Sequence, residues 1–349
     1  MFKQRREKGL FDEELRLSKL SKQNDPLLKL DKFIDWEFFR SILEFSLKTQ
    51  AKNKGGRKPY DYVLLFKMLI LQRYYNLSDD QIEYQVLDRL TFMRFLGIAL
   101  ADDVPDSKTV WNFRELLTEK RLIDKLFNIF TQKLNEQGLI ANEGRIMDAS
   151  FVEVPRQRNT KDENAQIKEG NTPEQWQEEP NKLRQKDVDA RWTQKNDVNY
   201  YGYKDHVKCD SKSKLIVKYE VTDASVHDSQ VVDELIDPTD QGQPLWADSA
   251  YSGKPIQRIL KRNNIKNRIH QKASKNKPLT TRQNNNNKVK SKVRVRVEHI
   301  FGFIENSMKG SYIRYIGIAR AKTAIGLMNL TYNLCRFTQL QAMPRIAVS

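Results

Sequence analysis

The hydrophobic pattern of the chain changes at Gly144, and this change limits the folds that the sequence can adopt. From about residue 30 to 137, apolar residues recur at the three- and four-residue spacing of one helix face. The clearest stripe consists of Leu122, Leu126, Phe127, Phe130 and Leu134. The N-terminal part is therefore predicted to be all-α. Several short helices with tight turns are compatible with a helix-turn-helix and, equally, with a plain helical support domain.

After Gly144 the pattern is typical of strands. Residues 145–155 predict one strand, 201–209 and 214–222 predict a hairpin, and a fourth strand ends at residues 245–248. Helices are expected from Asp228, from about Lys254, over residues 294–308 and over residues 319–340. Strands interleaved with helices predict a mixed α/β domain, in which a mixed sheet is flanked by helices.

These patterns divide the chain into three parts. Residues 1–27 lack periodicity and are expected to form a basic, flexible arm. Residues 28–140 form the helical domain, with an expected role in DNA binding or dimerisation. Residues 141–345 form the α/β domain, which carries a polar insertion at 156–198 and a basic segment at 254–297. At the start of one helix, Ser78 and Gln81 match the spacing of a capping box.

The positive charge of the chain is concentrated in the basic segment. The 349 residues include 61 Lys or Arg and 45 Asp or Glu, for a net charge of +16. Residues 254–297 alone contain 15 Lys or Arg and no acid, so this segment accounts for most of the excess. A block of one sign predicts a polyanion-binding surface; the alternative is a solvated basic loop. The tract Asn284–Asn287 within it is expected to be a flexible connector.

Composition also limits the compartment. Two cysteines, Cys209 and Cys335, exclude a disulfide scaffold and a zinc-finger array, and they fit a reducing environment. The basic N-terminus is not followed by the apolar stretch of a signal peptide. No apolar run approaches the ~20 residues that span a bilayer. We expect a soluble, intracellular protein of a reducing cytoplasm, without membrane association.

Three carboxylates are candidates for catalysis. Asp148 lies within a predicted strand, Asp248 ends a second strand, and Glu298 follows the basic segment on a predicted helix. Individually they could be a salt-bridge residue, a helix cap and a partner of Arg294. Brought together, they would repel one another unless a divalent cation lay between them. Carboxylate oxygens suit Mg²⁺, with Mn²⁺ as a substitute, and two such ions can promote phosphodiester chemistry.

Several motifs, in order along the chain, resemble those of bacterial insertion-sequence transposases with a DDE catalytic domain, in particular the insertion-sequence-five (InsH-like) family. The resemblance runs from about residue 30 to 340. The matching stretches are Tyr74–Asp79 (YYNLSD), Met147–Ser150 (MDAS), Asp187–Trp192 (DVDARW), Tyr201–His206 (YGYKDH), Val226–Ser229 (VHDS), Ala247–Tyr251 (ADSAY) and Arg294–Glu298 (RVRVE).

The resemblance implies an RNase H-like fold in which Asp148, Asp248 and Glu298 are the catalytic, metal-binding triad. It also implies a Tyr-x2-Arg-x3-Glu-x6-Lys signature around the glutamate. Arg294 matches that signature, whereas Ser291 and Glu305 replace its Tyr and Lys. Our hypothesis is that Lys309, eleven residues after Glu298 and on the same face of a continuous helix, takes the phosphate-contacting role. Further expected DNA contacts are Arg294, Lys204, Arg296, Lys292 and Lys290.

The predicted function is that of a DNA transposase. Such an enzyme binds the terminal inverted repeats of its mobile element, cleaves the DNA ends with metal ions and joins them to target DNA. A homodimer is expected because two element ends must be held together. Two alternatives remain open at this stage. One is a transposase-derived DNA-binding protein without catalytic activity; the other is a structure-selective, metal-dependent nuclease.

Overall fold

The computed structural model describes residues 9–47, 58–274 and 277–342. The chain forms two compact units, which we describe separately. The first comprises Met1–Gln72, Leu77–Leu116 and Gln341–Ser349, and the second comprises Arg73–Asn76 and Leu117–Leu340. No helix in the described residues is both long enough and apolar enough to cross a lipid bilayer.

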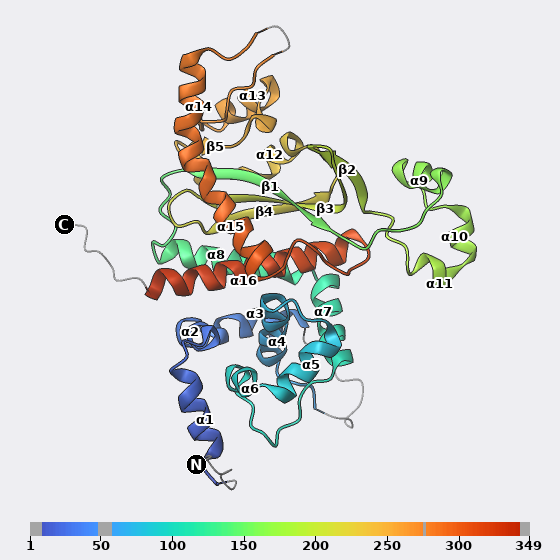
Figure 1. Ribbon diagram of the computed structural model, residues 1–349, viewed down its shortest axis with the longest axis vertical. Helices are drawn as coiled ribbons and strands as arrows, with labels where there is room; N and C mark the ends of the chain where they lie inside the picture. Colours follow the sequence, from blue (N-terminus) through green and yellow to red (C-terminus); the bar gives the residue numbers. More distant parts are fainter. Residues whose placement is uncertain (1–8, 48–57, 275–276, 343–349) are drawn as a thin grey trace, which may run out of the picture. The chain divides into compact units, whose positions relative to one another are not determined.

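The first unit is helical, as the sequence predicted (Figure 1). Its elements are α1 (Asp12–Ser21), α2 (Pro26–Phe33), η1 (Trp36–Phe39), α3 (Arg40–Leu47), α4 (Tyr62–Tyr74), α5 (Asp79–Asp88), α6 (Leu90–Leu96) and α7 (Ser107–Glu119). Within α4, Phe66, Leu69 and Ile70 are fully buried. The predicted capping box is confirmed: the Ser78 hydroxyl accepts the N–H of Gln81, and the Gln81 side chain accepts the N–H of Ser78.

The prediction of a flexible arm over residues 1–27 is wrong for its second half. Residues 12–21 form α1, and α2 begins at Pro26. Arg94 connects this region to α6: its Nη1 donates to Ser21 Oγ at 2.9 Å and its Nη2 to Asp25 Oδ2 at 2.9 Å. Helix α1 has no buried residue, so hydrophobic periodicity gave no signal for it. Residues 1–8 of the expected arm lie outside the described residues.

The second unit is built on a mixed sheet of six strands. They are β1 (Arg145–Glu153), β2 (Arg191–Lys195), β3 (Val198–Asp210), β4 (Ile216–Asp223), β5 (Pro244–Trp246) and β6 (Lys266–Asn267). The order is β2-β3-β1-β5-β6, and β4 also pairs with β3. Strand β1 is antiparallel to β3 and parallel to β5. This parallel pair at the centre of the sheet positions the candidate site.

Helices α8 (Leu122–Glu136) and α16 (Ile318–Ala342) cover one face of this sheet (Figure 1). Tyr219 of β4 donates its hydroxyl to Asp124 of α8 and packs its ring on Phe127. The rings of Phe130 and Phe337 join the two helices at 6.0 Å. Helix α8 therefore belongs to the sheet unit, whereas the sequence placed it in the helical domain of residues 28–140. Its apolar stripe is correct, but the stripe does not reveal which unit it packs against.

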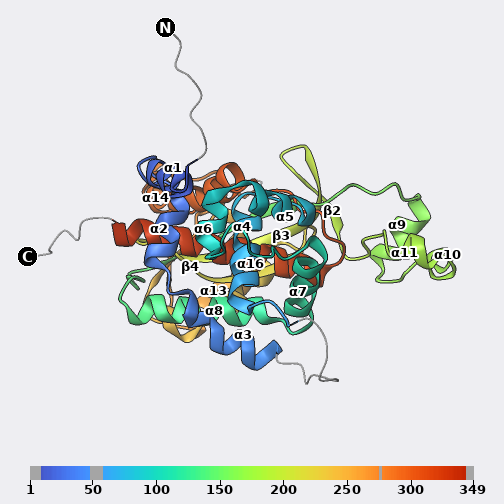
Figure 2. The same ribbon diagram turned by 90° about the horizontal axis from the view of Figure 1, so that it is seen from below.

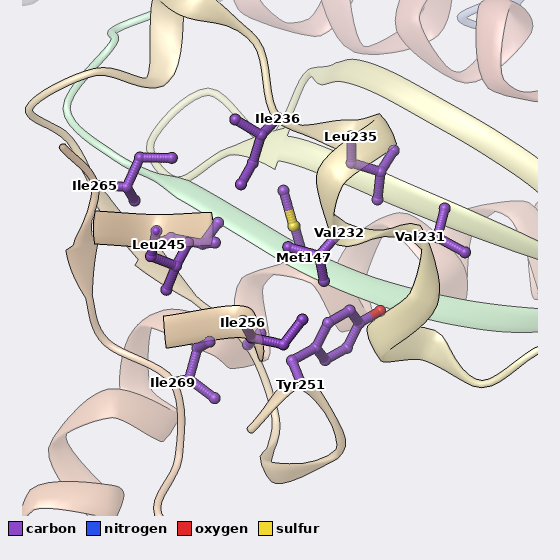
Figure 3. Close-up of a cluster of buried hydrophobic side chains, with 12 residues drawn as sticks. Met147, Val231, Val232, Leu235, Ile236, Leu245, Tyr251, Ile256, Ile265 and Ile269 are labelled. Carbon is purple, nitrogen blue, oxygen red and sulfur yellow. The ribbon is translucent and has the colours of Figure 1, made fainter. Parts of the chain in front are cut away.

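The opposite face carries a hydrophobic cluster that contains Met147 of β1 (Figure 3). Its other members come mainly from η2 (Asp228–Val231), α12 (Val232–Leu235), β5, η4 (Ser249–Tyr251) and α13 (Lys254–Arg262). Buried charges extend this face: Nε of Arg145 donates to Asp240 of η3 (Pro238–Asp240) at 2.9 Å. Because successive strand residues point to opposite faces, Met147 and Asp148 lie on different sides of β1.

The polar insertion is more ordered than its composition suggested. It contains α9 (Lys161–Lys168), α10 (Glu174–Glu178), α11 (Pro180–Leu183) and the edge strand β2. Figure 1 shows its three helices projecting from one end of the sheet. Helix α9 starts with a capping box between Thr160 and Glu163, and the indole of the buried Trp176 donates to Glu163 at 2.7 Å.

The basic segment continues into a nearly unbroken run of helical turns. These are α14 (Thr281–Arg294), η5 (Val295–Val297), α15 (Glu298–Gly302) and the π-helical turn η6 (Phe303–Ser307). Asn284–Asn287, predicted to be a flexible connector, lie within α14. The physical reason is the start of the helix, where a capping box between Thr280 and Gln283 satisfies the first backbone donors.

Candidate active site

The pairing of β1 with β5 brings two of the predicted carboxylates together. Arg145 pairs with Leu245 and Ile146 with Trp246 in parallel register. Asp148 and Asp248 each lie two residues beyond the last of these pairs, and they are close enough for their charges to interact. Asp248 directly follows β5, and its Oδ1 accepts the N–H of Ala250 at 2.8 Å at the start of η4. The carboxyl end of a parallel strand is a common location for ligand-binding side chains.

Asp148 lies in an environment that disfavours its charge. Burial raises the pKa of this carboxyl to about 6, and the nearby Asp248 acts in the same direction. The N–H of Ala149, which donates to Asp148 Oδ1 at 2.9 Å, and the guanidinium of Arg294 oppose the increase in pKa. Asp148 therefore has less compensating positive charge than its burial requires.

Arg294 brings the third carboxylate to the first. Its Nη1 donates to Asp148 Oδ2 at 2.8 Å, and its Nη2 donates to Glu298 Oε1 at 3.0 Å. Arg294 ends α14 and Glu298 begins α15, four residues later, so the continuous helical turns through η5 position both side chains. The side chain of Asp148 is 14% exposed and that of Glu298 is 54% exposed, so Arg294 connects a largely buried carboxylate on the sheet to one at the surface.

Two buried polar atoms near these carboxylates lack a hydrogen-bond partner in the described structure: Nε of Arg294 and the hydroxyl of Tyr251. Tyr251 is 1% exposed, and its ring belongs to the cluster in Figure 3. Burial and the charges of Asp228, Asp148 and Asp248 raise the pKa of its hydroxyl well above its usual range. A protonated hydroxyl is thus held in the field of three carboxylates, two of which are predicted to be catalytic.

The three predicted carboxylates suit a divalent cation by their chemistry. Their donors are hard oxygens, as Mg²⁺ and Mn²⁺ prefer, and Asp148 lies beside Asp248 without enough neutralising charge. In the described arrangement no three His, Cys, Asp or Glu side chains converge on one ion position, and Arg294 contacts two of the three carboxylates. The carboxylate oxygens of the triad are therefore suitable metal ligands, and in this arrangement the guanidinium of Arg294 contacts those of Asp148 and Glu298.

Comparison with known proteins decides the family. Residues 141–334, more than half of the chain, match the transposase DDE domain family. The chain belongs to this family. Residues 15–116 match a second family, described as transposase domain (DUF772). A solved structure, the piggyBac transposase synaptic complex with hairpin DNA, is similar with a TM-score of 0.44 and 13% identity over 90% of this chain and 75% of that chain.

The protein is thus a DNA transposase whose second unit is the RNase H-like DDE domain. Its mixed sheet, flanked by helices, agrees with the predicted fold; Asp148 lies on β1, and Asp248 follows β5. The insertion contributes β2 as an edge strand of this sheet.

Lys204 of the transposase is not available as the surface DNA contact that we expected. It is buried, and its ammonium donates to Asp228 Oδ1 at 2.8 Å and to the carbonyl of Val226 at 2.7 Å. Lys204 lies opposite Phe151 on the β1–β3 pair, and side chains on this face of the sheet point into the molecule. The motif that contains Lys204 therefore builds the protein interior beneath the site.

The other predicted DNA contacts differ in exposure. Lys292 is exposed on α14. Lys290 is partly buried, and its Nζ donates to the carbonyl of Ile269 at 2.7 Å. Arg296 donates Nη1 to the carbonyl of Ser211 at 2.7 Å. Only Lys292 of these three lacks such an anchoring contact among the described hydrogen bonds, so it is the strongest remaining candidate for a phosphate contact.

The helical argument for Lys309 is wrong. Helical turns end with η6 at Ser307, and Lys309 has φ +50°, in the left-handed region. Lys309 is exposed on the connection after the helix, not on a continuous helix face shared with Glu298. The helix predicted over residues 294–308 already ended before Lys309, so the assumption of a continuous helix through Lys309 was at odds with that prediction. A phosphate contact by Lys309 thus has no helical geometry to support it.

His270 is a residue of the site region that the sequence analysis missed. Its backbone N–H donates to the carbonyl of Ala247, next to Asp248, at 3.1 Å, and its Nε2 lies 3.3 Å from Ser291 Oγ. Burial, Arg294 and Lys290 lower the pKa of its imidazole. A lone histidine inside a block of lysines and arginines was the available signal. Ser291, which replaces the tyrosine of the family signature, contacts this histidine.

The Asp187–Trp192 motif has a structural role in the transposase. The hydroxyl of Tyr203 donates to Asp187 Oδ2 at 2.8 Å, and the N–H of Gly317 donates to the same oxygen at 3.1 Å. Asp189 Oδ2 accepts the N–H of Ile318 at 2.8 Å. The two carboxylates thus cap the start of α16 and connect it to β3.

Proposed function

We propose that this protein is the transposase of an insertion sequence of the insertion-sequence-five type, acting in the bacterial cytoplasm on the ends of its own element. It would bind the terminal inverted repeats as a homodimer, cleave the DNA at the element ends and join those ends to target DNA. The observation that carries the proposal is the convergence of Asp148 with Asp248 through the β1–β5 register and with Glu298 through Arg294.

In this proposal Asp148, Asp248 and Glu298 hold divalent cations, with Mg²⁺ as the physiological ion and Mn²⁺ as a substitute. Bound cations would stabilise the charge that develops on the phosphate and make the attacking hydroxyl or water more acidic. Arg294 would exchange carboxylate oxygens for phosphate oxygens, for which its planar guanidinium is equally suited. The buried Tyr251 hydroxyl, which lies in the field of these carboxylates, would donate to one of them and so fix its orientation.

The chemistry consists of two phosphoryl transfers. A water molecule attacks the phosphorus at the element end, the bond from phosphorus to the 3′ oxygen breaks, and the element keeps a 3′ hydroxyl. That hydroxyl then attacks a phosphorus of target DNA, and a 3′ oxygen of the target is the leaving group. The role of this chain is to align the phosphate with the three carboxylates, because positioning and charge stabilisation dominate such reactions.

The outer surface of α14 is the proposed DNA-facing element of the catalytic domain. None of its residues is buried, and Lys288 and Lys292 lie four positions apart on one exposed face. Such lysines contact phosphates and position DNA without reading its sequence. The helical unit, α1 to α7, would supply end recognition or dimerisation.

The test uses the full-length wild-type protein and the Asp248→Asn variant with labelled DNA that carries candidate element ends. We expect Mg²⁺-dependent cutting at the end by the wild type, and binding without cutting by the variant. Asp233→Asn is the matched control, because Asp233 is an exposed carboxylate paired with Arg262 outside the site. Tight binding without cutting by the wild type, in Mg²⁺ and in Mn²⁺, would refute the catalytic proposal.

A supercoiled target plasmid separates a transposase from a nuclease. A transposase joins the cleaved end to the plasmid, giving a labelled product of higher mass. A nuclease with the same metal site releases the end without joining. Cutting that is never followed by joining would therefore retain the metal site and reject strand transfer.

A further inference from the structure

Helix α1 packs little of its surface against the chain that carries it. None of its residues is buried, and Nη1 of Arg94 on α6 holds it by donating to the carbonyl of Leu17 at 3.3 Å and to Ser21 Oγ at 2.9 Å. A helix of ten residues is marginal in water on its own, and most helices are stabilised by packing an apolar face. Phe11, directly before α1, is nevertheless 65% exposed, and Leu15 is 45% exposed.

The exposed apolar residues of this region continue into a positive charge. Phe11, Leu15 and Lys19 follow one another at intervals of four residues, so they form one stripe, which we call the α1 stripe. Lys19 is exposed as well. Leu15 and Lys19 lie on the side of the helix opposite to Leu17, whose carbonyl contacts α6. The α1 stripe therefore faces away from the contact that holds α1.

A second exposed apolar surface lies where α5 packs beside α7. The N–H of Ser107 donates to Glu83 Oε2 at 2.7 Å, and Nη1 of Arg114 donates to Asp79 Oδ1 at 2.6 Å, so the two helices run antiparallel. Trp111 lies four residues after Ser107 and three before Arg114, which places it on the side of α7 that contacts α5. It is still 44% exposed. The junction of α5 and α7 thus presents an aromatic ring to solvent.

Helix α5 adds a stripe of its own to this surface. Leu87 and Tyr84 are 61% and 65% exposed, and the exposed Asp80 lies four residues before Tyr84. We call these three residues the α5 stripe. The helix contains four acidic residues and no basic one, so it repels a phosphate backbone and suits a basic protein surface. Figures 1 and 2 show α1 and α7 on opposite sides of the helical unit, so the chain's own α1 does not cover this surface.

We propose that the α1 stripe of one copy of this protein docks on the α5–α7 surface of a second copy. The inference rests on the homodimer of the proposed function and names its interface. Each stripe consists of two apolar residues and one charged residue, spaced by three or four positions, and the two charges are opposite. When the helices are antiparallel, the apolar residues meet and Lys19 reaches Asp80. Parallel helices would instead place Lys19 on Leu87 and Phe11 on Asp80.

A two-fold dimer forms this contact twice, because each copy carries both surfaces. Trp111 would pack beside the docked helix, where a large aromatic side chain contributes strongly to binding. The contact also accounts for α1 as a helix: its apolar face is buried in the dimer instead of in its own chain.

The first test measures the dimer without DNA or metal. Sedimentation velocity of the full-length protein over a range of concentrations gives the dissociation constant. We expect a dimer at micromolar concentration, and Phe11→Ser should raise the dissociation constant at least about tenfold. Phe45→Ser is the matched control, because Phe45 on α3 is 89% exposed and belongs to neither surface. Circular dichroism establishes that both variants fold.

A charge exchange tests the alignment of the helices. Lys19→Glu and Asp80→Lys should each raise the dissociation constant about tenfold, and the double variant should return to within about threefold of the wild type. Lys19→Glu combined with Asp88→Lys is the control, because Asp88 is an exposed acid at the other end of α5. That combination should stay weak.

Cross-linking between two different chains tests contact directly. Leu15→Cys protein is mixed with Tyr84→Cys protein and treated with a short bis-maleimide; the native Cys209 and Cys335 are buried. A cross-linked dimer can then form only between chains. We expect it in this mixture, and not when Phe45→Cys replaces Tyr84→Cys.

Two results would overturn the interface. One is a wild-type protein that stays monomeric at tens of micromolar; the other is a dimer that Phe11→Ser and the charge variants leave unchanged and that the mixed cysteine variants fail to cross-link. Both are obtained without DNA, so metal-dependent cleavage of element ends by the wild type would stand. A dimer that behaves as expected, in a protein that never cuts, would retain the interface while the catalytic proposal fails.

Discussion

Nη1 of Arg294 lies 2.8 Å from Oδ2 of Asp148, within a site where the same guanidinium also contacts Glu298. A guanidinium and a divalent cation are attracted to the same carboxylate oxygens, and both cannot occupy them fully. Arg294 thus neutralises the site in the arrangement described here, and binding of metal or of a DNA phosphate would have to displace it. This gives Arg294 a measurable effect on metal affinity, independent of any contact with DNA.

Arg294→Gln is expected to increase the affinity of the DNA-free protein for Mn²⁺ or Mg²⁺. A partly exposed ion pair contributes about 1 kcal/mol or less, so the increase should be no more than about fivefold. Isothermal titration calorimetry measures it, with Arg296→Gln as the control because Arg296 contacts a backbone carbonyl instead of a carboxylate. Cleavage should nevertheless fall, because the proposed phosphate contact of Arg294 is lost. Unchanged or weaker metal binding would contradict competition.

Lys204→Met should destabilise the fold without changing the DNA affinity of the molecules that remain folded. The substitution leaves Asp228, whose side chain is 14% exposed, without its cation, and losing one partner of a buried pair costs about 3–5 kcal/mol. Urea unfolding gives the free energy, and the double variant Lys204→Met/Asp228→Asn should recover part of it. A fully stable Lys204→Met protein with weaker DNA binding would favour the DNA contact that the sequence suggested.

The sequence predicted what depends on local pattern. The strand that carries Asp148 was predicted over residues 145–155 and is β1, and the capping box at Ser78 is present. The position of α14 within the basic segment was missed because its helix signal is the capping box at Thr280, not an apolar stripe. The separation of Lys204 from the surface could not be predicted, because a strand pattern does not specify which face other elements cover.

Site geometry was predictable only in part. The resemblance implied that Asp148 and Asp248 share one site, and both residues follow shortly after the paired residues of β1 and β5. The hydrogen-bonded ion pair between Arg294 and Asp148 joins residues 146 positions apart, and no local sequence pattern predicts it. The hydrogen bonds of Asn287 and Lys290, which hold α14 to the segment after β6, were likewise not predictable from the sequence.

Lys292→Gln should weaken DNA binding in a salt-dependent way. Lys292 is exposed on α14, and loss of one phosphate contact lowers the slope of log affinity against log salt by about 1. Fluorescence anisotropy with duplex DNA at several salt concentrations measures this slope. Lys290→Gln is the comparison, since its ammonium is anchored on Ile269 and should contribute less to duplex contacts. Equal slopes for Lys292→Gln and wild type would exclude the contact.

Asp205 makes the stability of the catalytic domain depend on pH. Burial raises the pKa of this carboxyl, on β3, to about 7, and its Oδ1 accepts Nδ2 of Asn329 on α16 at 3.0 Å. Oδ1 of Asn329 has no hydrogen-bond partner in the described structure. A protonated Asp205 can donate to that oxygen, so each side chain would then satisfy the other. The folded state therefore favours the protonated acid.

The sign of the pH effect follows from proton binding. Between about pH 4 and pH 7, the unfolded chain has released the proton of Asp205 and the folded chain still holds it, so the free energy of unfolding falls as pH rises. Below this window both states are protonated, and above it both are ionised. A shift of about 3 pKa units corresponds to about 4 kcal/mol at most.

Asp205→Asn should remove this dependence because an amide can donate to Asn329 Oδ1 at every pH. We expect the variant to equal the wild type in stability near pH 4 and to exceed it at pH 8. Urea unfolding at both pH values measures the difference, and Asp233→Asn controls for the loss of an exposed carboxylate. A variant that is less stable than wild type at pH 8 would mean that Asp205 is ionised in the folded protein and that its charge is stabilised by groups other than Asn329.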